Sequence, residues 1–231
     1  HTRDRRQRQM CIRDREFGKD VVHSMLMDVT SEQDVKRAVS NSVNAFGGID
    51  ILVANAGFAS AALFEKTSSK LWDKNMDILS KGCFLISREV YQKMIDQKNG
   101  GSIIFVSSKN SLNASKGASA YSVAKSSLLH LSRSIALEGS SHKIRSNVVN
   151  PDAVIQNSKI WQGEWTKQRA ISNKISVNQV EEFYKNRSLL KVSILPEDIA
   201  EGIYFFASSK SKKSTGNIIN VDGGNITSFT R

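Results

Sequence analysis

The sequence predicts an α/β fold in which a doubly wound parallel sheet is covered by helices on both faces. Short apolar runs alternate with longer segments of helical periodicity along most of the 231 residues. These runs are nearly continuous rather than interrupted at every second residue, which is typical of strands buried on both faces. Alternation of strand and helix favours parallel strands joined by right-handed crossovers.

The first expected elements are a strand over residues 21–27 and a helix that begins at Thr30. Residues 21–27 read Val-Val-His-Ser-Met-Leu-Met, a mostly apolar run of strand length. Thr30 and Gln33 fit a capping box, and valines then recur at helical spacing until Gly47. A second apolar run, over residues 49–54, predicts the next strand.

The later elements follow from the same signals. Gly139 ends one amphipathic segment, and Pro196 suits the first turn of the last helix because its missing N–H needs no partner there. The remaining elements, in chain order, are a helix over 69–94, a strand over 102–106, a helix over 119–138, a strand over 144–150, a helix from 196 and a strand over 217–221.

The length favours one domain, because a chain of 231 residues buries roughly 70% of its unfolded surface in its core. Residues 1–16 show neither helical nor strand periodicity and are rich in arginine. We expect a non-native or disordered leader there, with a basic interaction tail as the alternative. The folded domain then covers residues 17–231.

Composition excludes several classes of protein. The net charge is +11, but lysine and arginine are scattered among acids without a stripe of basic and aromatic residues, so nucleic-acid binding is not expected. No apolar stretch approaches the ~20 residues that span a membrane. The two cysteines, Cys11 and Cys83, have no redox or metal-ligand spacing. We expect a cytoplasmic protein without a metal site.

Three residues, Ser108, Tyr121 and Lys125, indicate a proton-transfer centre. Tyr121 and Lys125 are four apart in an expected helix and therefore share a face. A cation ~4 Å from a phenol would lower its pKa by up to about three units, and Tyr121 could then act as a general acid or base. Ser108, at a strand end, would hold the reacting oxygen. A surface pair is the alternative for the Tyr–Lys spacing alone.

Six short motifs follow one another along the chain: Asp28-Val29, Ala54-Asn55-Ala56-Gly57, Ser108, Tyr121-x-x-x-Lys125, Asn150-Pro151 and Val221-Asp222-Gly223-Gly224. In this order they resemble the short-chain dehydrogenase/reductase family over residues 17–231. The resemblance implies a Rossmann-like fold and an oxidoreductase that uses NAD or NADP. It also implies a homodimer or homotetramer built through the long helices.

The same resemblance assigns residues to the cofactor. Asp28 and Val29 would contact the adenine, Val154 the nicotinamide carboxamide, and Lys125 the nicotinamide ribose. Open α/β sheets bind ligands at the carboxyl ends of their strands, so these residues should converge on one crevice. The implied cofactor-binding residues are Asp28, Val29, Asn55, Ala56, Gly57, Tyr121, Lys125, Pro151 and Val154.

Longer segments narrow the resemblance. Residues 107–110, 149–154, 158–161 and 190–199 are similar to the dehydrogenase half of bifunctional rhamnulose-phosphate aldolase/lactaldehyde dehydrogenases. This implies NAD-linked oxidation of a small hydroxy-aldehyde such as lactaldehyde, in rhamnose catabolism. Two alternatives stay open: a dehydrogenase of sugar alcohols or other secondary alcohols, and an inactive, cofactor-free oligomerisation module.

Several residues depart from the family pattern. Leu79 stands where an active-site Asn is usual, and Asn110 would either supply a replacement amide or satisfy loop backbone. Asp152 replaces a glycine and would either position a substrate hydroxyl or cap the next turn. Trp161, with Trp165 four residues later, would form a lid over the substrate or a helix packed on the body.

A glycine-rich phosphate loop is also missing. No G-x-G-x-x-G occurs in the sequence, and only an atypical segment precedes residue 21. We therefore expect the first strand-helix-strand unit to be absent, the affinity for the dinucleotide to be low, and the strand at 49–54 to be an exposed edge. The choice between NAD and NADP would depend on the missing unit, so NAD is implied only by the narrower resemblance.

Overall fold

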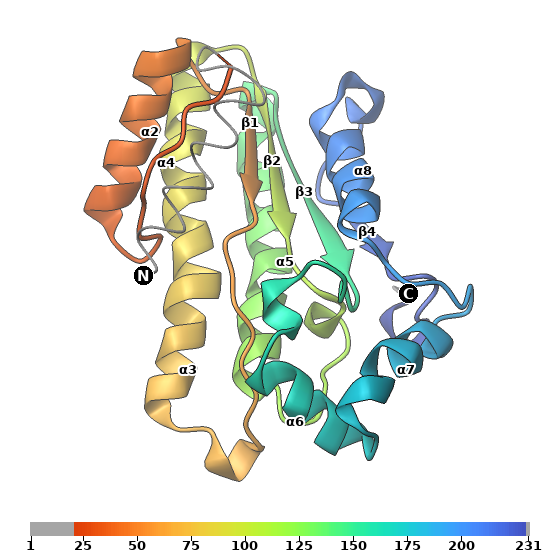
Figure 1. Ribbon diagram of the computed structural model, residues 1–231. Helices are drawn as coiled ribbons and strands as arrows, with labels where there is room; N and C mark the ends of the chain where they lie inside the picture. The colour runs from red at the N-terminus through yellow and green to blue at the C-terminus, as the bar shows by residue number, and fades with distance from the viewer. Residues whose placement is uncertain (1–20, 230–231) are drawn as a thin grey trace.

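The computed structural model describes residues 21–229, so the leader expected at residues 1–16 lies outside the described residues. A sheet of four parallel strands forms the centre of the molecule, in the order β1-β2-β3-β4 (Figure 1). This parallel sheet with flanking helices is the α/β fold that the alternating pattern predicts. The strands are β1 (Ile51–Ala54), β2 (Gly101–Val106), β3 (Ile144–Pro151) and β4 (Ile218–Val221).

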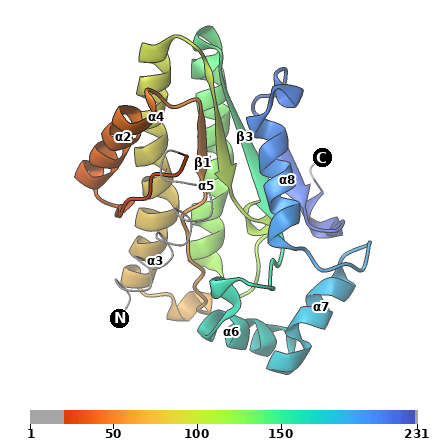
Figure 2. The ribbon, with the colours of Figure 1, turned by 45° about the horizontal axis from the view of Figure 1, so that its top comes forward.

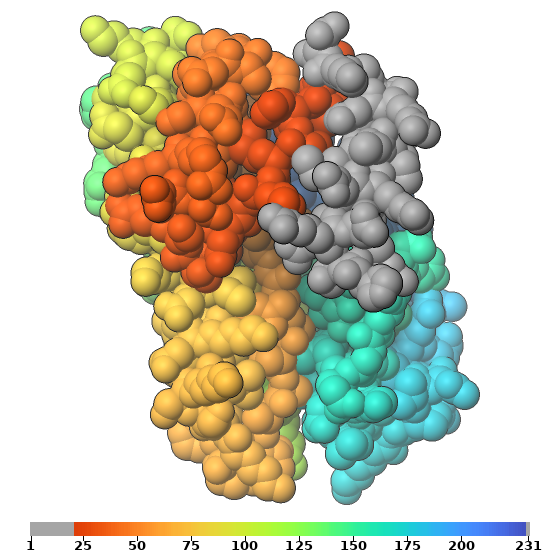
Figure 3. All heavy atoms as spheres, turned by 60° about the vertical axis from the view of Figure 1, so that its left-hand side comes forward, coloured from red at the N-terminus to blue at the C-terminus, as the bar shows by residue number. Residues whose placement is uncertain are grey.

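Helices cover the two faces of the sheet unequally. α4 and α5 pack on one face and α8 on the other, while α2 packs against α4 (Figures 1 and 2). α2 and α3 follow one another along the same side of the molecule (Figure 3). The helices are α2 (Glu32–Phe46), α3 (Ser69–Asn75), α4 (Gly82–Gln97), α5 (Ser119–Gly139), α6 (Glu164–Asn173), α7 (Val180–Arg187) and α8 (Pro196–Ala207).

The core forms on both sides of β2, because successive residues of a strand point to opposite faces. Ile103 and Phe105 pack with α4 and α5, whereas Ile104 and Val106 pack with Ile199 and other residues of the α8 side. All residues of β2 after Gly101 are buried. The continuous apolar run is therefore explained by burial on both faces.

The expected strand at residues 21–27 is wrong, because this segment is irregular and joins no ladder. A strand needs a neighbour to accept its hydrogen bonds, and among the described residues β1 pairs only with β2. β1 is therefore an edge of the described sheet, as expected, and its Ile51 and Val53 side chains are exposed.

The first helix begins one residue later than expected. Ser31, not Thr30, is the N-cap, and its hydroxyl accepts a hydrogen bond from Asp34 N at 3.2 Å. Thr30 is occupied elsewhere, since its N–H and hydroxyl both donate to Asp28 Oδ1. The helix ends at Gly47, whose φ of 80° is the left-handed conformation of a glycine C-cap.

The long helix expected over 69–94 is continuous to Gln97, with a π-helical segment, Met76–Lys81, joining α3 to α4. The other expected boundaries agree with the structure within two residues. The Trp-bearing stretch after β3 forms α6 and α7. None of the helices in residues 21–229 is long and apolar enough to cross a membrane.

Phe105→Ala should lower the free energy of unfolding by about 3–5 kcal/mol, because it leaves a cavity at a fully buried position of β2. Phe64→Ala is the control, since the Phe64 side chain is 80% exposed and its removal should change stability by less than about 0.5 kcal/mol. Urea unfolding of both variants measures the difference. Equal losses would contradict this assignment of the core.

Candidate active site

The candidate site lies at the carboxyl end of the sheet, where β2 meets the first turns of α5. Ser107, directly after β2, donates its N–H to Val149 O on β3 and its hydroxyl to Lys125 O on α5 at 2.9 Å. Both bonds are buried, so they hold the end of β2 against α5. Ser108 and Tyr121 are brought to the same place by this contact.

Lys125 is buried and its ammonium donates to Val106 O at 2.8 Å. Burial lowers the pKa of Lys125 to about 8, and the nearby Cys83 acts in the opposite direction. The ammonium therefore helps to fasten α5 to the last residue of β2. Cys83 is buried too, and burial raises the pKa of its thiol, which fits the expected packing role.

Tyr121 is buried beside Ser108. Burial raises the pKa of the phenol, interaction with the Ser108 side chain lowers it, and the charge of Asp152 raises it further. The net direction is upward, so the lowered phenol pKa that the sequence led us to expect is not found here. The physical reason is that burial favours the neutral phenol, while the Lys125 ammonium is bonded to Val106 O.

The loop after β2 is stabilised by its own side chains. Ser108 caps the short 3₁₀ turn Lys109–Ser111, accepting from Asn110 N at 3.2 Å. Asn110 is buried, and its side-chain oxygen accepts from the Ser115 hydroxyl at 2.8 Å. Asn110 Oδ1 thus already satisfies a group of the same loop, whereas Leu79 is fully buried in the apolar cluster around Tyr121.

Asp152 joins three segments at the edge of the site. Its Oδ2 accepts from the Arg187 guanidinium on α7 and from Asn225 Nδ2, the latter at 2.8 Å. Its carboxylate is thus held in an ion pair. This arrangement fastens the end of α7 and the segment after β4 to the loop that follows β3.

Aromatic side chains cover Tyr121. Its ring lies 5.6 Å from that of Trp165 on α6, and Trp165 lies 6.2 Å from Trp161. Trp161 in turn contacts Tyr184 of α7 at 5.0 Å between ring centroids. These contacts show that the segment is packed on the body of the protein; a role of Trp161 and Trp165 as a lid over the substrate stays a prediction.

Three cationic residues near the site were not assigned from the sequence: Lys109, Arg169 and Arg187. The Arg169 guanidinium lies 4.6 Å from the Trp165 ring centroid, and that of Arg187 lies 4.3 Å from the Tyr184 ring. The spacing of Trp165 and Arg169, four residues apart on one helix, is the only sequence signal for them. Arg187 reaches the site through tertiary packing alone.

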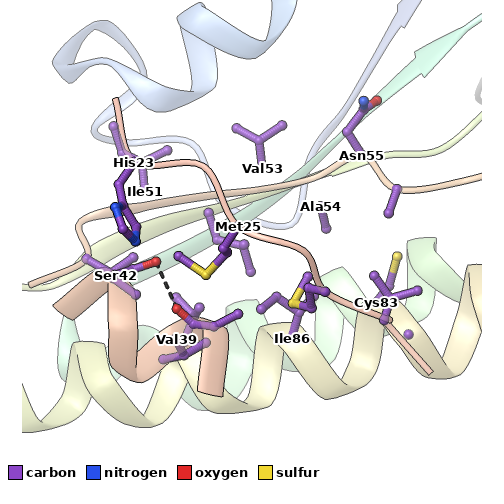
Figure 4. Close-up of a pocket in the computed structure, with 18 of the residues that line it drawn as sticks. His23, Met25, Val39, Ser42, Ile51, Val53, Ala54, Asn55, Cys83 and Ile86 are labelled. Atoms are coloured by element: carbon purple, nitrogen blue, oxygen red, sulfur yellow. Dashed lines mark hydrogen bonds between the residues drawn. The ribbon is translucent and has the colours of Figure 1, made fainter. Parts of the chain in front are cut away.

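A cavity of about 830 Å³, which we call the edge cavity, lies between residues 23–29, α2, β1 and α4. Figure 4 shows Met25 between β1 and the helix residues Val39 and Ile86. Val29, Asn55 and Ala56, from the expected cofactor set, also line it. Asp28 does not line the cavity; its carboxylate accepts two hydrogen bonds from Thr30, which lower the pKa of the acid.

The described residues fit the nicotinamide half of a dinucleotide better than its pyrophosphate half. A Cβ at Gly57 would lie 3.3 Å from Leu79 Cδ2 and 3.9 Å from Lys125 Nζ, so the bare backbone keeps the approach to the ammonium clear. Pro151 ends β3 at the same edge, and Val154 packs on the α8 side of the core. Residues 21–229 contain no glycine-rich turn that would cradle a pyrophosphate.

No group of three or more His, Cys, Asp and Glu side chains that could hold a metal ion occurs among residues 21–229. At the candidate site, the structure brings together the phenol of Tyr121, the hydroxyl of Ser108 and the buried Lys125.

Sequence comparison identifies relatives along nearly the whole chain. A family model described as enoyl-(acyl carrier protein) reductase matches residues 2–225. The uncharacterized oxidoreductase YuxG of Bacillus subtilis is 50% identical over 215 residues, which are 93% of this chain but 31% of YuxG. Sorbitol-6-phosphate 2-dehydrogenase of Escherichia coli is 32% identical over 91% of this chain and 81% of its own length.

Structural comparison agrees with the sequence matches. Sorbitol-6-phosphate 2-dehydrogenase SrlD from Erwinia amylovora superposes with a TM-score of 0.89 at 28% identity, over 94% of this chain and 84% of that chain. The aldohexose dehydrogenase AldT of Thermoplasma acidophilum gives a TM-score of 0.78 at 25% identity, over 87% of this chain and 77% of that chain.

The buried ammonium of Lys125 should make stability depend on pH. Its folded pKa of about 8 lies below the usual 10.5, so the unfolded chain binds more protons between these values. Relative to Lys125→Met, the wild type should gain up to roughly 3 kcal/mol of unfolding free energy as the pH rises through this window. Urea unfolding of both proteins across the window measures this, and a constant difference would contradict it.

Proposed function

The chain belongs to the short-chain dehydrogenase/reductase family, and on this premise we propose that Ser108, Tyr121 and Lys125 catalyse hydride transfer between a nicotinamide dinucleotide and a small hydroxylated substrate. Members of this family are NAD(P)-dependent oxidoreductases. The observation that carries the proposal is the contact between α5 and the end of β2. It buries Tyr121 and Lys125 beside Ser108 at the carboxyl edge of the sheet.

Each residue has a distinct role in this proposal. Tyr121 exchanges a proton with the substrate oxygen, Ser108 holds that oxygen by a hydrogen bond, and Lys125 positions the phenol-bearing face of α5. Hydride acceptance or donation is the chemistry that NAD or NADP supplies when bound. Since burial favours the neutral phenol, Tyr121 is well suited to donate its proton to a carbonyl.

The same premise assigns the cofactor contacts. We place the nicotinamide ribose near Lys125 and Gly57, where the bare backbone leaves the ammonium approachable. Asp28 and Val29 are proposed for the adenine end, and Val154 for the carboxamide. The other proposed contacts are Asn55, Ala56, Tyr121 and Pro151.

We propose a small hydroxy-aldehyde such as lactaldehyde as the substrate. The narrower resemblance over residues 107–110, 149–154, 158–161 and 190–199 supports it. The hydrate of an aldehyde loses a hydride from carbon and a proton from oxygen to give the acid. In this direction the phenolate form of Tyr121 accepts that proton, and no cysteine nucleophile is needed.

A sugar alcohol or its phosphate is the second candidate substrate. It is favoured by the two sorbitol-6-phosphate 2-dehydrogenases, one similar in sequence and one in structure. Oxidation of a secondary alcohol uses the same loss of a hydride and a proton. The two candidate substrates therefore share the proposed roles of Ser108, Tyr121 and Lys125. They would differ in the residues that contact the rest of the substrate.

We also propose a homo-oligomer, a dimer or tetramer assembled through the long helices. α4 and α5 expose apolar side chains at Phe84, Val123 and Leu137, and the Leu137 side chain is 78% exposed. Apolar groups gathered on two adjacent helices are typical of a surface that another chain covers.

Tyr121→Phe should lower kcat/KM for the alcohol or aldehyde at least about 100-fold, because it removes the proton-transfer hydroxyl and keeps the ring that packs on Trp165. Dinucleotide binding, measured by calorimetry, should persist. Tyr204→Phe is the control, since this tyrosine is 59% exposed on α8. Turnover by Tyr121→Phe within about threefold of the wild type would refute the proposed role.

A substrate panel should separate the two candidates. Comparison of kcat/KM for lactaldehyde and sorbitol, which are both neutral, with NAD and with NADP is expected to favour lactaldehyde with NAD. The expected preference is at least tenfold, equivalent to about 1.4 kcal/mol in the transition state. Preference for sorbitol would replace the hydroxy-aldehyde with the second candidate.

A further inference from the structure

Two cationic side chains beside the candidate site are buried without a carboxylate partner. Lys109 is 5% exposed and Arg169 is 3% exposed. Within residues 21–229, neither forms a salt bridge, although eight other charged pairs do. A buried charge without a counter-charge is unfavourable, so such residues are expected to have a partner when the protein works.

The present partners of both cations are neutral oxygens of one loop. Lys109 Nζ donates to Asn113 O at 3.3 Å and to the Ser115 hydroxyl at 3.2 Å. Arg169 donates from one terminal nitrogen to Lys116 O at 2.8 Å. Its Nε is buried and has no hydrogen-bond partner among the described residues. Part of the donor capacity of Arg169 therefore remains unused.

The nearest acid does not neutralise these two cations. Asp152 is already bonded to Arg187 and Asn225. Burial is the largest influence on the pKa of Lys109 and lowers it. The charge of Asp152 raises this pKa, and the charges of Arg187 and Arg169 lower it. Among the described residues, Asp152 is the acid that raises the pKa of Lys109, and it is already paired with Arg187.

Both unpaired cations adjoin the residues proposed for catalysis. Lys109 directly follows Ser108 in the chain. The Arg169 guanidinium lies against the ring of Trp165, and the ring of Trp165 lies 5.6 Å from that of Tyr121. A substrate oxygen held by Ser108 would therefore place the rest of a small molecule within the field of these cations.

We propose that the substrate carries, besides its reacting carbon, an anionic group, a carboxylate or a phosphate, which Lys109 and Arg169 bind; among the candidates above, this selects an anionic hydroxy-aldehyde or a polyol phosphate over lactaldehyde, which is neutral. The inference rests on the proposed function, because it uses the place of the reacting oxygen at Ser108 and Tyr121. The planar guanidinium suits two oxygens of such a group, and the ammonium adds a point charge. The anion supplies the counter-charge that residues 21–229 do not provide.

The plainer alternative is that both cations only fasten the loop over residues 113–117 to the fold. In that case, their removal would lower stability without changing affinity for anions. Arg145 is a matched control, because its guanidinium also donates to backbone carbonyls, Phe206 O and Ser214 O, but at the opposite end of the sheet. Arg145→Gln should therefore show the loss of stability that follows from removing a cation that donates hydrogen bonds to backbone carbonyls.

The test is calorimetric binding of two probes, orthophosphate and L-lactate, to the full chain at constant ionic strength. We expect the wild type to bind one of them. Lys109→Met and Arg169→Gln should each raise the Kd at least tenfold, and Lys109→Arg should restore most of the affinity. Arg145→Gln should leave the Kd within twofold of the wild type. If Arg169→Gln does not fold, Lys109→Met and Lys109→Arg decide the result.

The two probes distinguish the sources of the anion. Binding of lactate alone would assign a carboxylate, and binding of orthophosphate alone a phosphate ester; both outcomes support the inference. Binding of neither probe would overturn it, as would equal Kd values for the wild type and Lys109→Met. Tyr121→Phe should bind the anion like the wild type. If Tyr121→Phe loses turnover but the wild type binds neither anion, the proposed function stands and only this inference is overturned.

Discussion

The candidate site depends on the contact between the start of α5 and the end of β2. Two hydrogen bonds make it, from Lys125 Nζ to Val106 O and from Ser107 Oγ to Lys125 O. Both lie in a dry part of the core, where losing a buried partner costs about 1–3 kcal/mol. Because Lys125 uses its side chain and its backbone in this contact, the register of α5 is set relative to β2. Tyr121, one turn earlier, is thereby held beside Ser108.

This contact also determines the electrostatics of the phenol. The Lys125 ammonium is directed at a backbone carbonyl, and burial is the largest influence on Tyr121, so its pKa rises. A neutral phenol is a ready proton donor. The rings of Trp165, Trp161 and Tyr184 pack in a row beside Tyr121 and help to bury it. Arg169 stacks on Trp165 and Arg187 on Tyr184, so both guanidinium groups lie near the site. Burial and the charge of Asp152 both raise the pKa of Tyr121, whereas they shift the pKa of Lys109 in opposite directions.

The edge of the sheet at β1 borders the edge cavity. Val29 and Asn55 line this cavity, and Asp28 lies beside it with its carboxylate bonded to Thr30. Among the described residues β1 has no partner on its outer side, and its Ile51 and Val53 side chains are exposed. Residues 21–27 have a strand-like composition but join no ladder. Pairing, and not local propensity, decides whether such a segment becomes a strand.

The sequence by itself determined the α/β class and all four strands of the described sheet, and it predicted the residues that we propose for proton transfer. Hydrophobic periodicity and the spacing of Tyr121 and Lys125 are local properties, so they can be recognised along the chain. Tertiary structure alone decided the raised pKa of Tyr121, the ion pair of Asp152 with Arg187, and the burial of Lys109 and Arg169 beside one loop. These depend on which distant segments exclude water from a charge, and burial of that kind arises only when the segments pack together.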